Sequence, residues 1–313
     1  MNHRPWRRGT NHAPQPGDRL LMDAVWRGEV RAATKAELLA ALAPAVRNQV
    51  EGRLARAYPR QLGDALNTVD EATQSFRRNL YEVGERLRAA SLRAVLIKAD
   101  LQADYVYDNF DLVVRPEEWT RACAALEGWY VRRSTYWLER STQLLLEPPT
   151  GPSAHLHTGI SWFGVPVIDT TRLFDRAAPD AKNRCLIPHP AEQLRIWVAH
   201  AVFQNLAFDL SEMLALRDLL SPDVVADARG EAAREGWKTG FDGALETARD
   251  AIRRLDCRLP VRLPVPLPSA ISLVAGAEHT RHLLHHGRAR TAAREATLRV
   301  PLVVAKKRRA LVG

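Results

Sequence analysis

The sequence predicts an α/β (α+β) protein, with a small mixed sheet between N-terminal helices and a C-terminal helical domain. Apolar residues recur at helical spacing before residue 90, and helical periodicity returns from about residue 170. Between these regions lie short runs of apolar and β-branched residues, at 92–97, 110–114, 129–135, 142–147 and 154–161. This order, helices, then strands mixed with a helix, then helices, leads to the predicted fold class.

The N-terminal helices are expected within residues 19–90. Thr34 and Glu37 have the spacing of a capping box ahead of an apolar run with helical periodicity. Pro44 lies inside that run and is a candidate breakpoint for the helix. A second helix is expected over residues 66–90, where apolar side chains recur at spacings of three and four: Phe76, Leu80, Val83 and Leu87.

The central segment alternates strands with one short helix. The run at 110–114 ends at Arg115, and Pro116 is suited to the first position of a helix that Gly128 ends. Residues 148–152, Pro-Pro-Thr-Gly-Pro, predict a turn between two later strands. Together these segments predict a small mixed sheet.

The second half predicts a helical domain. Residues 191–209 are expected to form one long helix, with Leu194, Val198, Ala201 and Val202 on a common face. Residues 259–268 contain four prolines and predict an extended linker. Shorter helices are expected at residues 211–220, 222–236, 240–256 and 268–286.

These patterns divide the 313 residues into four parts. Residues 1–18 are expected to be a disordered basic arm, 19–180 the α/β domain with its N-terminal helices, 181–286 the helical domain, and 287–313 a basic C-terminal segment. The net charge of +9 resides at the two ends, because residues 279–313 hold nine Arg or Lys and one Glu. Such an end either contacts polyanions without sequence preference or is a solvated tail.

Several protein classes lack support in the sequence. No apolar run is long enough for a transmembrane helix, and the start has no apolar stretch typical of a signal peptide. Cys123, Cys185 and Cys257 are scattered and form no C-x-x-C, as is typical of reduced cytoplasmic proteins. No P-loop, dinucleotide-binding, nucleophile-elbow or zincin motif is present. We therefore expect a cytoplasmic protein without a membrane partner.

A set of short motifs in a definite order suggests a family. They are Leu96-Ile97-Lys98-Ala99-Asp100, then Asn109-Phe110-Asp111-Leu112-Val113-Val114-Arg115-Pro116, then His155-Leu156-His157, and a later helix bearing His200-Ala201. Over about residues 85–221 this order resembles the uncharacterised nucleotidyltransferase family, which is distantly related to polymerase-β-type enzymes. The resemblance implies a nucleotidyltransferase-type sheet and transfer of NMP from an NTP to a hydroxyl of an acceptor.

The resemblance also implies a metal site with a simple physical basis. Carboxylates at positions i and i+2 of one strand share a face, and a third on a neighbouring strand completes a hard-oxygen site for Mg²⁺ or Mn²⁺ with the NTP. On this pattern Asp111, Asn109 and His155 occupy the catalytic and metal positions, and His157 is a further candidate ligand. Lys98 and Arg115 are candidate phosphate contacts or, alternatively, solvated cations at strand ends.

The chain departs from the family pattern at most of these positions. Asn109 and His155 stand where carboxylates are expected, and Ala99 replaces a glycine after Lys98. Three interpretations remain open: a metal site of altered composition, a β-bulge that turns Asp108 into the site, or a binding platform that has lost transfer chemistry.

Other histidines offer weaker candidates. His155 and His157 share a strand face and either bind a metal or form structural hydrogen bonds. His279, His282 and His286 fall on one side of an expected helix, as zinc ligands do, but a basic helical face is the favoured interpretation of that pattern. His200 and Asp218 match the family helix pattern and are expected to hydrogen-bond between helices.

Three functions remain in competition on this basis. The first is a nucleotidyltransferase that uses an NTP and an unknown acceptor, which is a small molecule, a peptide or a protein. The second is a catalytically inactive protein of the same fold that binds a partner. The third is an RNA-binding or RNA-modifying protein that is steered by its basic C-terminus, including residues 306–309.

Overall fold

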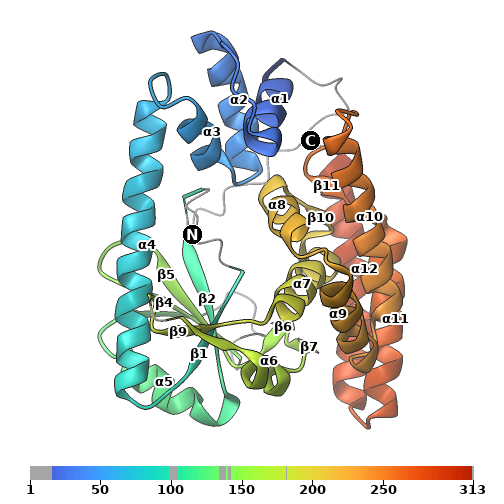
Figure 1. Cartoon of the computed structure of the whole chain (residues 1–313). Coiled ribbons are helices and arrows are strands. Elements are labelled where there is room, and N and C mark those ends of the chain that lie inside the picture. The colour runs from blue at the N-terminus through green and yellow to red at the C-terminus, as the bar shows by residue number, and fades with distance from the viewer. Residues whose placement is uncertain are drawn as a thin grey trace.

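The computed structural model describes residues 16–98, 105–106, 108–133, 139, 142–180 and 182–311. It has a mixed α/β architecture, with a seven-stranded sheet on one side and a group of helices on the other (Figure 1). Most of the expected N-terminal basic arm lies outside the described residues, as do Ala99 and Asp100. Within the part described, no helix is long and apolar enough to cross a membrane.

The sheet has the strand order β3-β4-β5-β2-β1-β9-β8. At its centre, β1 (Ala94–Ile97) pairs antiparallel with β2 (Asn109–Val114), and β2 pairs parallel with β5 (Ser153–His157). The expected strands near residues 129 and 142 are β3 (Tyr130–Arg133) and β4 (Gln143–Glu147). On the other edge lie β9 (Cys185–Ile187) and β8 (Ala178–Asp180), which the sequence pattern did not reveal.

Alternate residues of the central strands serve two different cores. Leu96, Leu112 and Leu156 pack against one face of the sheet, together with α4 (Gly63–Ala89) and α5 (Trp119–Ala125). Val95, Ile97 and Val113 face the opposite side and belong to the larger core that the helical elements share. Because side chains alternate along a strand, Asp111 points to the same side as Val113, toward the helical elements.

The N-terminal helices share their core with the C-terminal helices. They are α1 (Pro16–Leu21), a π-helical segment η1 (Met22–Arg27), α2 (Lys35–Arg47) and α3 (Glu51–Ala57), and their buried residues, such as Leu38 and Leu54, join the larger core. The Thr34–Glu37 capping box is present. Pro44 does not break α2, because it lies in the last turn, where the helix simply ends at Arg47.

The remaining elements of the first half match or refine the expected ones. Pro116 begins a 3-10 turn, η2 (Pro116–Glu118), that leads into α5, and Gly128 follows with a left-handed φ of 94°. The last expected strand divides into β5 and β6 (Ile160–Trp162), and β6 pairs with β7 (Val165–Ile168). The helix α6 (Thr170–Arg176) then leads to the β8–β9 edge.

The expected long helix over residues 191–209 is confirmed as a helical run to Asn205 and is wrong over residues 206–209. α7 (Pro190–His200) passes into a π-helical segment, η3 (Ala201–Asn205), and Leu206 ends it with a left-handed φ of 56°. The chain then forms β10 (Ala207–Phe208), which pairs with β11 (Val265–Pro266) of the proline-rich segment. This pairing of two segments far apart in sequence has no local signal.

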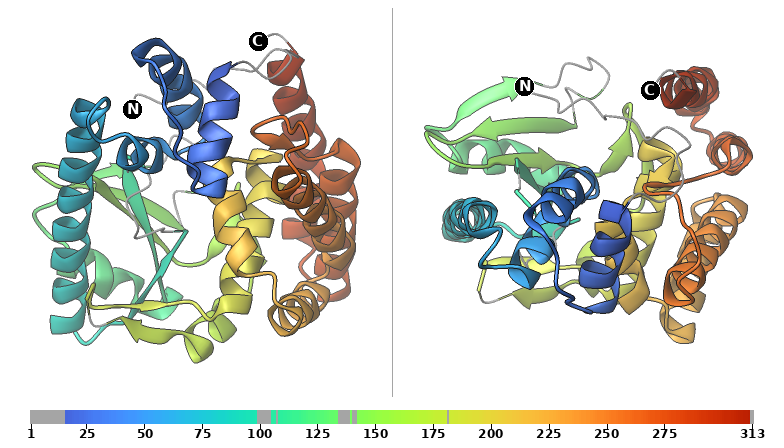
Figure 2. Two further views of the ribbon diagram at one scale, coloured as in Figure 1. Left: turned by 45° about the horizontal axis from the view of Figure 1, so that its top comes forward. Right: turned by 90° about the horizontal axis from the view of Figure 1, so that it is seen from above.

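The later helices form the far side of the molecule (Figure 2). They are α8 (Leu210–Asp218), α9 (Pro222–Arg234), α10 (Lys238–Asp256) and α11 (Ser269–His285), close to the expected ranges. A further helix, α12 (Ala289–Leu311), was not expected and packs along α11 as a helical hairpin. Its buried residues, Ala292 and Val303 among them, explain why the basic segment is helical.

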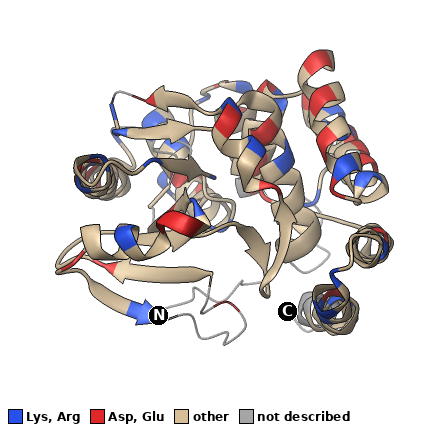
Figure 3. Ribbon diagram, turned by 90° about the horizontal axis from the view of Figure 1, so that it is seen from below, with Lys and Arg blue, Asp and Glu red and all other residues tan. Residues whose placement is uncertain are grey.

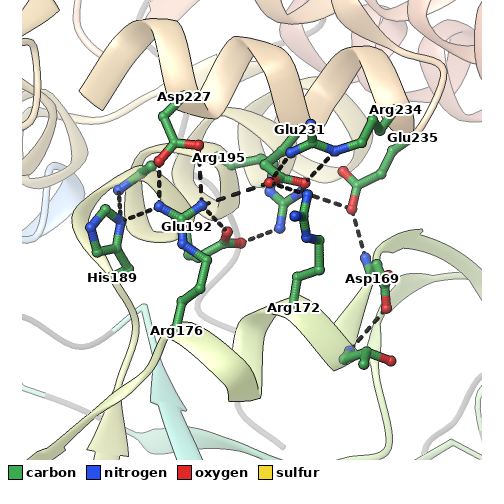
Figure 4. A network of polar contacts seen from close by, with 12 residues as sticks. Asp169, Arg172, Arg176, His189, Glu192, Arg195, Asp227, Glu231, Arg234 and Glu235 are labelled. Atoms are coloured by element: carbon green, nitrogen blue, oxygen red, sulfur yellow. Dashed lines mark hydrogen bonds and ion pairs between the residues drawn. The ribbon is translucent and has the colours of Figure 1, made fainter. Parts of the chain in front are cut away.

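A network of buried ion pairs joins α6, α7 and α9 (Figure 4). Arg195 of α7 is fully buried and contacts Glu192 of the same helix and Glu235, whose Oε1 lies 2.9 Å from Arg195 Nη1. Arg172 of α6 lies 2.7 Å from Glu231 of α9. Burial raises the pKa of Glu235 to about 7 even though Arg195 opposes this shift. The network therefore ties the end of the sheet domain to the helical part.

Candidate functional site

The candidate site lies where β1, β2 and β5 run side by side. In the strand register, Asp111 on β2 stands opposite Ile97 on β1 and opposite His155 on β5. Lys98 follows β1 directly, and His157 lies two residues beyond His155 on the same face. The sheet thus places all four side chains at one point, on the face that looks toward the helices.

Asp111 is the centre of this group, and its carboxylate is fully engaged. Lys98 Nζ lies 3.0 Å from Asp111 Oδ2. His155 Nδ1 lies 3.0 Å and His157 Nε2 2.8 Å from Asp111 Oδ1. An ionised carboxylate only accepts hydrogen bonds, so each of these imidazole nitrogens donates its N–H to Asp111. We call these four residues the Asp111 cluster.

Burial, neighbouring charges and hydrogen bonds determine the pKa values of Asp111 and His157. Burial disfavours the Asp111 carboxylate, but the Lys98 charge and the two imidazole hydrogen bonds outweigh it and hold the pKa of Asp111 well below its usual range. Burial and the adjacent His155 ring lower the pKa of His157 to about 4. At neutral pH, Asp111 is therefore ionised and His157 is neutral.

Lys98 reaches the carboxylate from a strained backbone position. Its φ is 54°, in the left-handed region that costs a residue with a side chain about 1–2 kcal/mol. Its side chain is 19% exposed and forms the ion pair with Asp111. The lysine expected to contact phosphate therefore already has an anionic partner within the protein.

Asn109 and Asp108 occupy the start of β2. Asn109 is two residues before Asp111 and pairs with Ser153 of β5. The β2–β5 register continues from Asn109 to Val113 without a shift, so no β-bulge in this stretch turns Asp108 toward Asp111. The backbone carbonyl of Asp108 instead accepts a hydrogen bond from Ser153 N at 3.1 Å.

Arg115 lies at the other end of β2, away from the Asp111 cluster. It is four positions beyond Asp111, a distance of roughly 13 Å along the strand. Its guanidinium stacks over the Phe174 ring at 4.6 Å and lies 3.8 Å from Asp175. The structure therefore does not bring the two candidate phosphate contacts, Lys98 and Arg115, together.

The remaining histidine candidates have other partners. His200 Nδ1 lies 2.9 Å from Glu212 of α8, while Asp218 is exposed and lies beside Arg217, so the expected His200–Asp218 bond is not formed. His279 is buried, and burial together with nearby cationic groups lowers its pKa to about 3. Its neighbour His282 stacks on it, and among the described residues no third metal-ligating side chain converges with these two.

One group in the described part of the chain has the composition of a metal centre. Ligand atoms of Asp111, His155 and His157 all lie within 4.8 Å of one another. A carboxylate with two imidazoles is a set that transition metals accept. The sequence predicted these three residues as candidate metal ligands. It predicted Lys98 as a phosphate contact or a solvated cation, and it did not predict the ion pair between Lys98 and Asp111.

Comparison with known proteins adds no assignment. No protein-family model matches the chain. No curated protein matches it significantly either.

Proposed function

We propose that this chain is a nucleotidyltransferase-like protein that acts by binding a partner and not by Mg²⁺-dependent transfer of NMP. The observation that carries the proposal is the Lys98 ammonium 3.0 Å from Asp111, the sole carboxylate that remains at the position of the expected metal site. The resemblance over residues 85–221 supports the location, since Asp111 and His155 face each other on neighbouring strands.

The residues of the Asp111 cluster do not fit Mg²⁺. This ion requires near-octahedral coordination by hard oxygen atoms and binds through carboxylates and phosphates. Here one carboxylate is present, Lys98 holds one of its oxygens, and two imidazoles hold the other. Asn109 adds an amide oxygen but no charge. The same deficit of anionic oxygen applies to Mn²⁺.

The test is titration calorimetry with the four NTPs in the presence of Mg²⁺, with EDTA as the metal-free control. We expect no metal-dependent heat up to millimolar nucleotide, because the Asp111 charge is already neutralised. Asp175→Asn serves as a matched control, since Asp175 is an exposed carboxylate outside the cluster. Metal-dependent NTP binding that persists in Asp175→Asn but disappears in Asp111→Asn would refute the proposal.

A second candidate function is transition-metal binding by Asp111, His155 and His157. The convergence of their three ligand atoms favours it. In that state the two imidazoles direct lone pairs and not N–H groups at the centre, while Lys98 stays on the outer carboxylate oxygen and orients it. Zn²⁺, Co²⁺ or Fe²⁺ suits this donor set, in contrast to Mg²⁺.

This candidate predicts a gain of metal affinity in Lys98→Met. Removal of a cation 3.0 Å from the carboxylate relieves repulsion of the incoming ion, and we expect Co²⁺ to bind about tenfold more tightly. The visible absorption of bound Co²⁺ reports the binding. His155→Ala should abolish the signal, whereas His285→Ala, an exposed histidine on α11, should not. If neither wild type nor Lys98→Met binds Co²⁺, the candidate is wrong.

A further inference from the structure

The hairpin of α11 and α12 presents a surface that is unusually rich in exposed aliphatic side chains. Within the described residues, eleven large hydrophobic side chains are exposed, and five of them lie on these two helices. They are Leu273 (37%), Val274 (41%), Leu284 (56%), Val300 (54%) and Val304 (43%). Isolated exposed aliphatics are ordinary, but their concentration on one hairpin indicates an interaction surface.

Each helix of the hairpin carries these residues on one face. On α11 the buried residues are Ser272, Ala275, Gly276, His279 and Leu283, and the exposed face holds Ala270, Leu273, Val274, Ala277, Arg281 and Leu284. On α12 the buried residues recur as Ala292, Glu295, Arg299 and Val303, and the exposed side includes Arg290, Ala293, Thr297, Val300 and Val304. Aliphatic and basic side chains thus occupy the outer faces of both helices, where a surface helix usually carries mainly polar residues.

The charge of this surface is entirely positive. The acidic residues of the two helices are Glu278, which accepts a hydrogen bond from Thr239 N at 2.9 Å, and Glu295, which pairs with Arg299 at 2.7 Å. Arg281, Arg288 and Arg290 are exposed and have no carboxylate partner in the described residues. Figure 3 shows this hairpin end-on, whereas the neighbouring α10 carries acidic and basic residues in equal number. The sequence adds four cations at residues 306–309, whose side chains lie outside the described part.

We propose that the outer surface of the α11–α12 hairpin docks on an anionic phospholipid membrane. Exposed aliphatic side chains beside Arg and Lys suit the boundary between anionic headgroups and acyl chains, because the aliphatic groups are buried there while the cations contact phosphates. RNA fits less well, because residues 269–311 contain no Phe, Tyr or Trp on which bases stack. A second copy of the chain also fits less well, because it would bring two positive surfaces together.

The test is sedimentation of the full-length protein with vesicles. We expect binding to phosphatidylcholine vesicles that contain phosphatidylserine and little binding to vesicles of phosphatidylcholine alone. The double variant Arg288→Ser/Arg290→Ser should bind about 25-fold more weakly, at roughly fivefold for each cation. Val300→Asp/Val304→Asp should weaken binding at least tenfold, because it replaces two exposed aliphatic side chains of α12 with carboxylates.

Two control variants outside the hairpin test whether the loss of vesicle binding is specific to this surface. Arg249→Ser removes an exposed cation from α10, and Leu39→Asp replaces an exposed aliphatic residue of α2, so both should bind vesicles as wild type does. Circular dichroism confirms that each variant is folded. Equal binding to both vesicle types, or equal binding by all variants, overturns the proposal. So does a shift to RNA in a competition assay, or a dimer in solution that Val300→Asp/Val304→Asp dissociates.

Discussion

Arg195→Met is expected to lower the free energy of unfolding by about 3–5 kcal/mol. Arg195 is fully buried, and its guanidinium contacts the carboxylates of Glu192, Glu231 and Glu235. Methionine retains most of the side-chain volume, so the loss reflects charge more than a cavity. Glu192 retains Arg176 and Glu231 retains Arg172 and Arg234, but removal of the cation leaves the buried Glu235 without its arginine partner. An unpaired buried carboxylate costs more than an ordinary core substitution.

The stability loss caused by Arg195→Met should depend on pH. The pKa of Glu235 is already raised to about 7 by burial, with Arg195 acting in the opposite direction. Without Arg195, we expect Glu235 to take up a proton more readily in the folded state. Protonation removes one uncompensated charge, so the destabilisation should be smaller at pH 5 than at pH 8.

Urea unfolding measures the stability loss of Arg195→Met and its dependence on pH. A surface arginine of the same network provides the control. Arg234 is 55% exposed and donates Nε to Glu231 at 3.0 Å, so Arg234→Met should cost less than about 1 kcal/mol. If Arg195→Met does not fold, Arg195→Met/Glu192→Met should recover part of the stability, because both charges are then removed. Equal small losses for Arg195→Met and Arg234→Met would contradict a structural role for the network.

His157→Gln is expected to gain about 2 kcal/mol of stability relative to wild type when the pH falls from 7 to 5. The folded state holds the pKa of His157 at about 4, while an unfolded histidine titrates near 6.5. Between these values the unfolded chain binds the proton and the folded chain does not. Wild type therefore loses stability as the pH falls from about 6.5 toward 4, and a glutamine without a titrating proton does not share that loss.

Comparison of wild type with His157→Gln isolates the contribution of His157 to the pH dependence of stability. Glutamine retains an N–H donor for Asp111, and groups such as Glu235 titrate equally in both proteins and cancel. The measurement is urea unfolding of wild type and His157→Gln at pH 7, 6 and 5. His285→Gln, on the exposed side of α11, should show no such trend. A difference between wild type and His157→Gln that stays constant across this range would show that His157 is not buried as a neutral side chain.

Local patterns predicted the parts of the fold that local interactions determine. The Thr34–Glu37 box begins α2, and the spacing of Phe76, Leu80 and Val83 identifies α4 because these residues bury one helical face. The β8–β9 edge and the β10–β11 pair are very short, and their pairing depends on contacts between distant segments. α12 lacked a clear apolar period, and its helix is stabilised by packing on α11.

In the candidate site, too, local patterns predicted some residues, while contacts between distant segments could not be predicted. Asp111, His155 and His157 were predictable because strand alternation places residues two apart on one face. That Lys98 turns onto Asp111 was not, because the left-handed φ of Lys98 has no signal in a sequence without glycine there. The buried network was also missed, because its local i, i+3 pairs, Glu192–Arg195 and Glu231–Arg234, are ordinary within a helix. The contacts that join these pairs, such as Arg172–Glu231 and Arg195–Glu235, link segments far apart in the sequence.

We propose that the composition of the Asp111 cluster prevents it from binding Mg²⁺. Titration of Mg²⁺ into wild type and into Asn109→Asp/His155→Asp tests this directly, since the double variant supplies the two carboxylates that the family pattern expects. We predict no saturable Mg²⁺ binding by wild type at millimolar concentrations and measurable binding by the variant. Equal, saturable Mg²⁺ binding by both proteins, abolished in Asp111→Asn, would contradict the account.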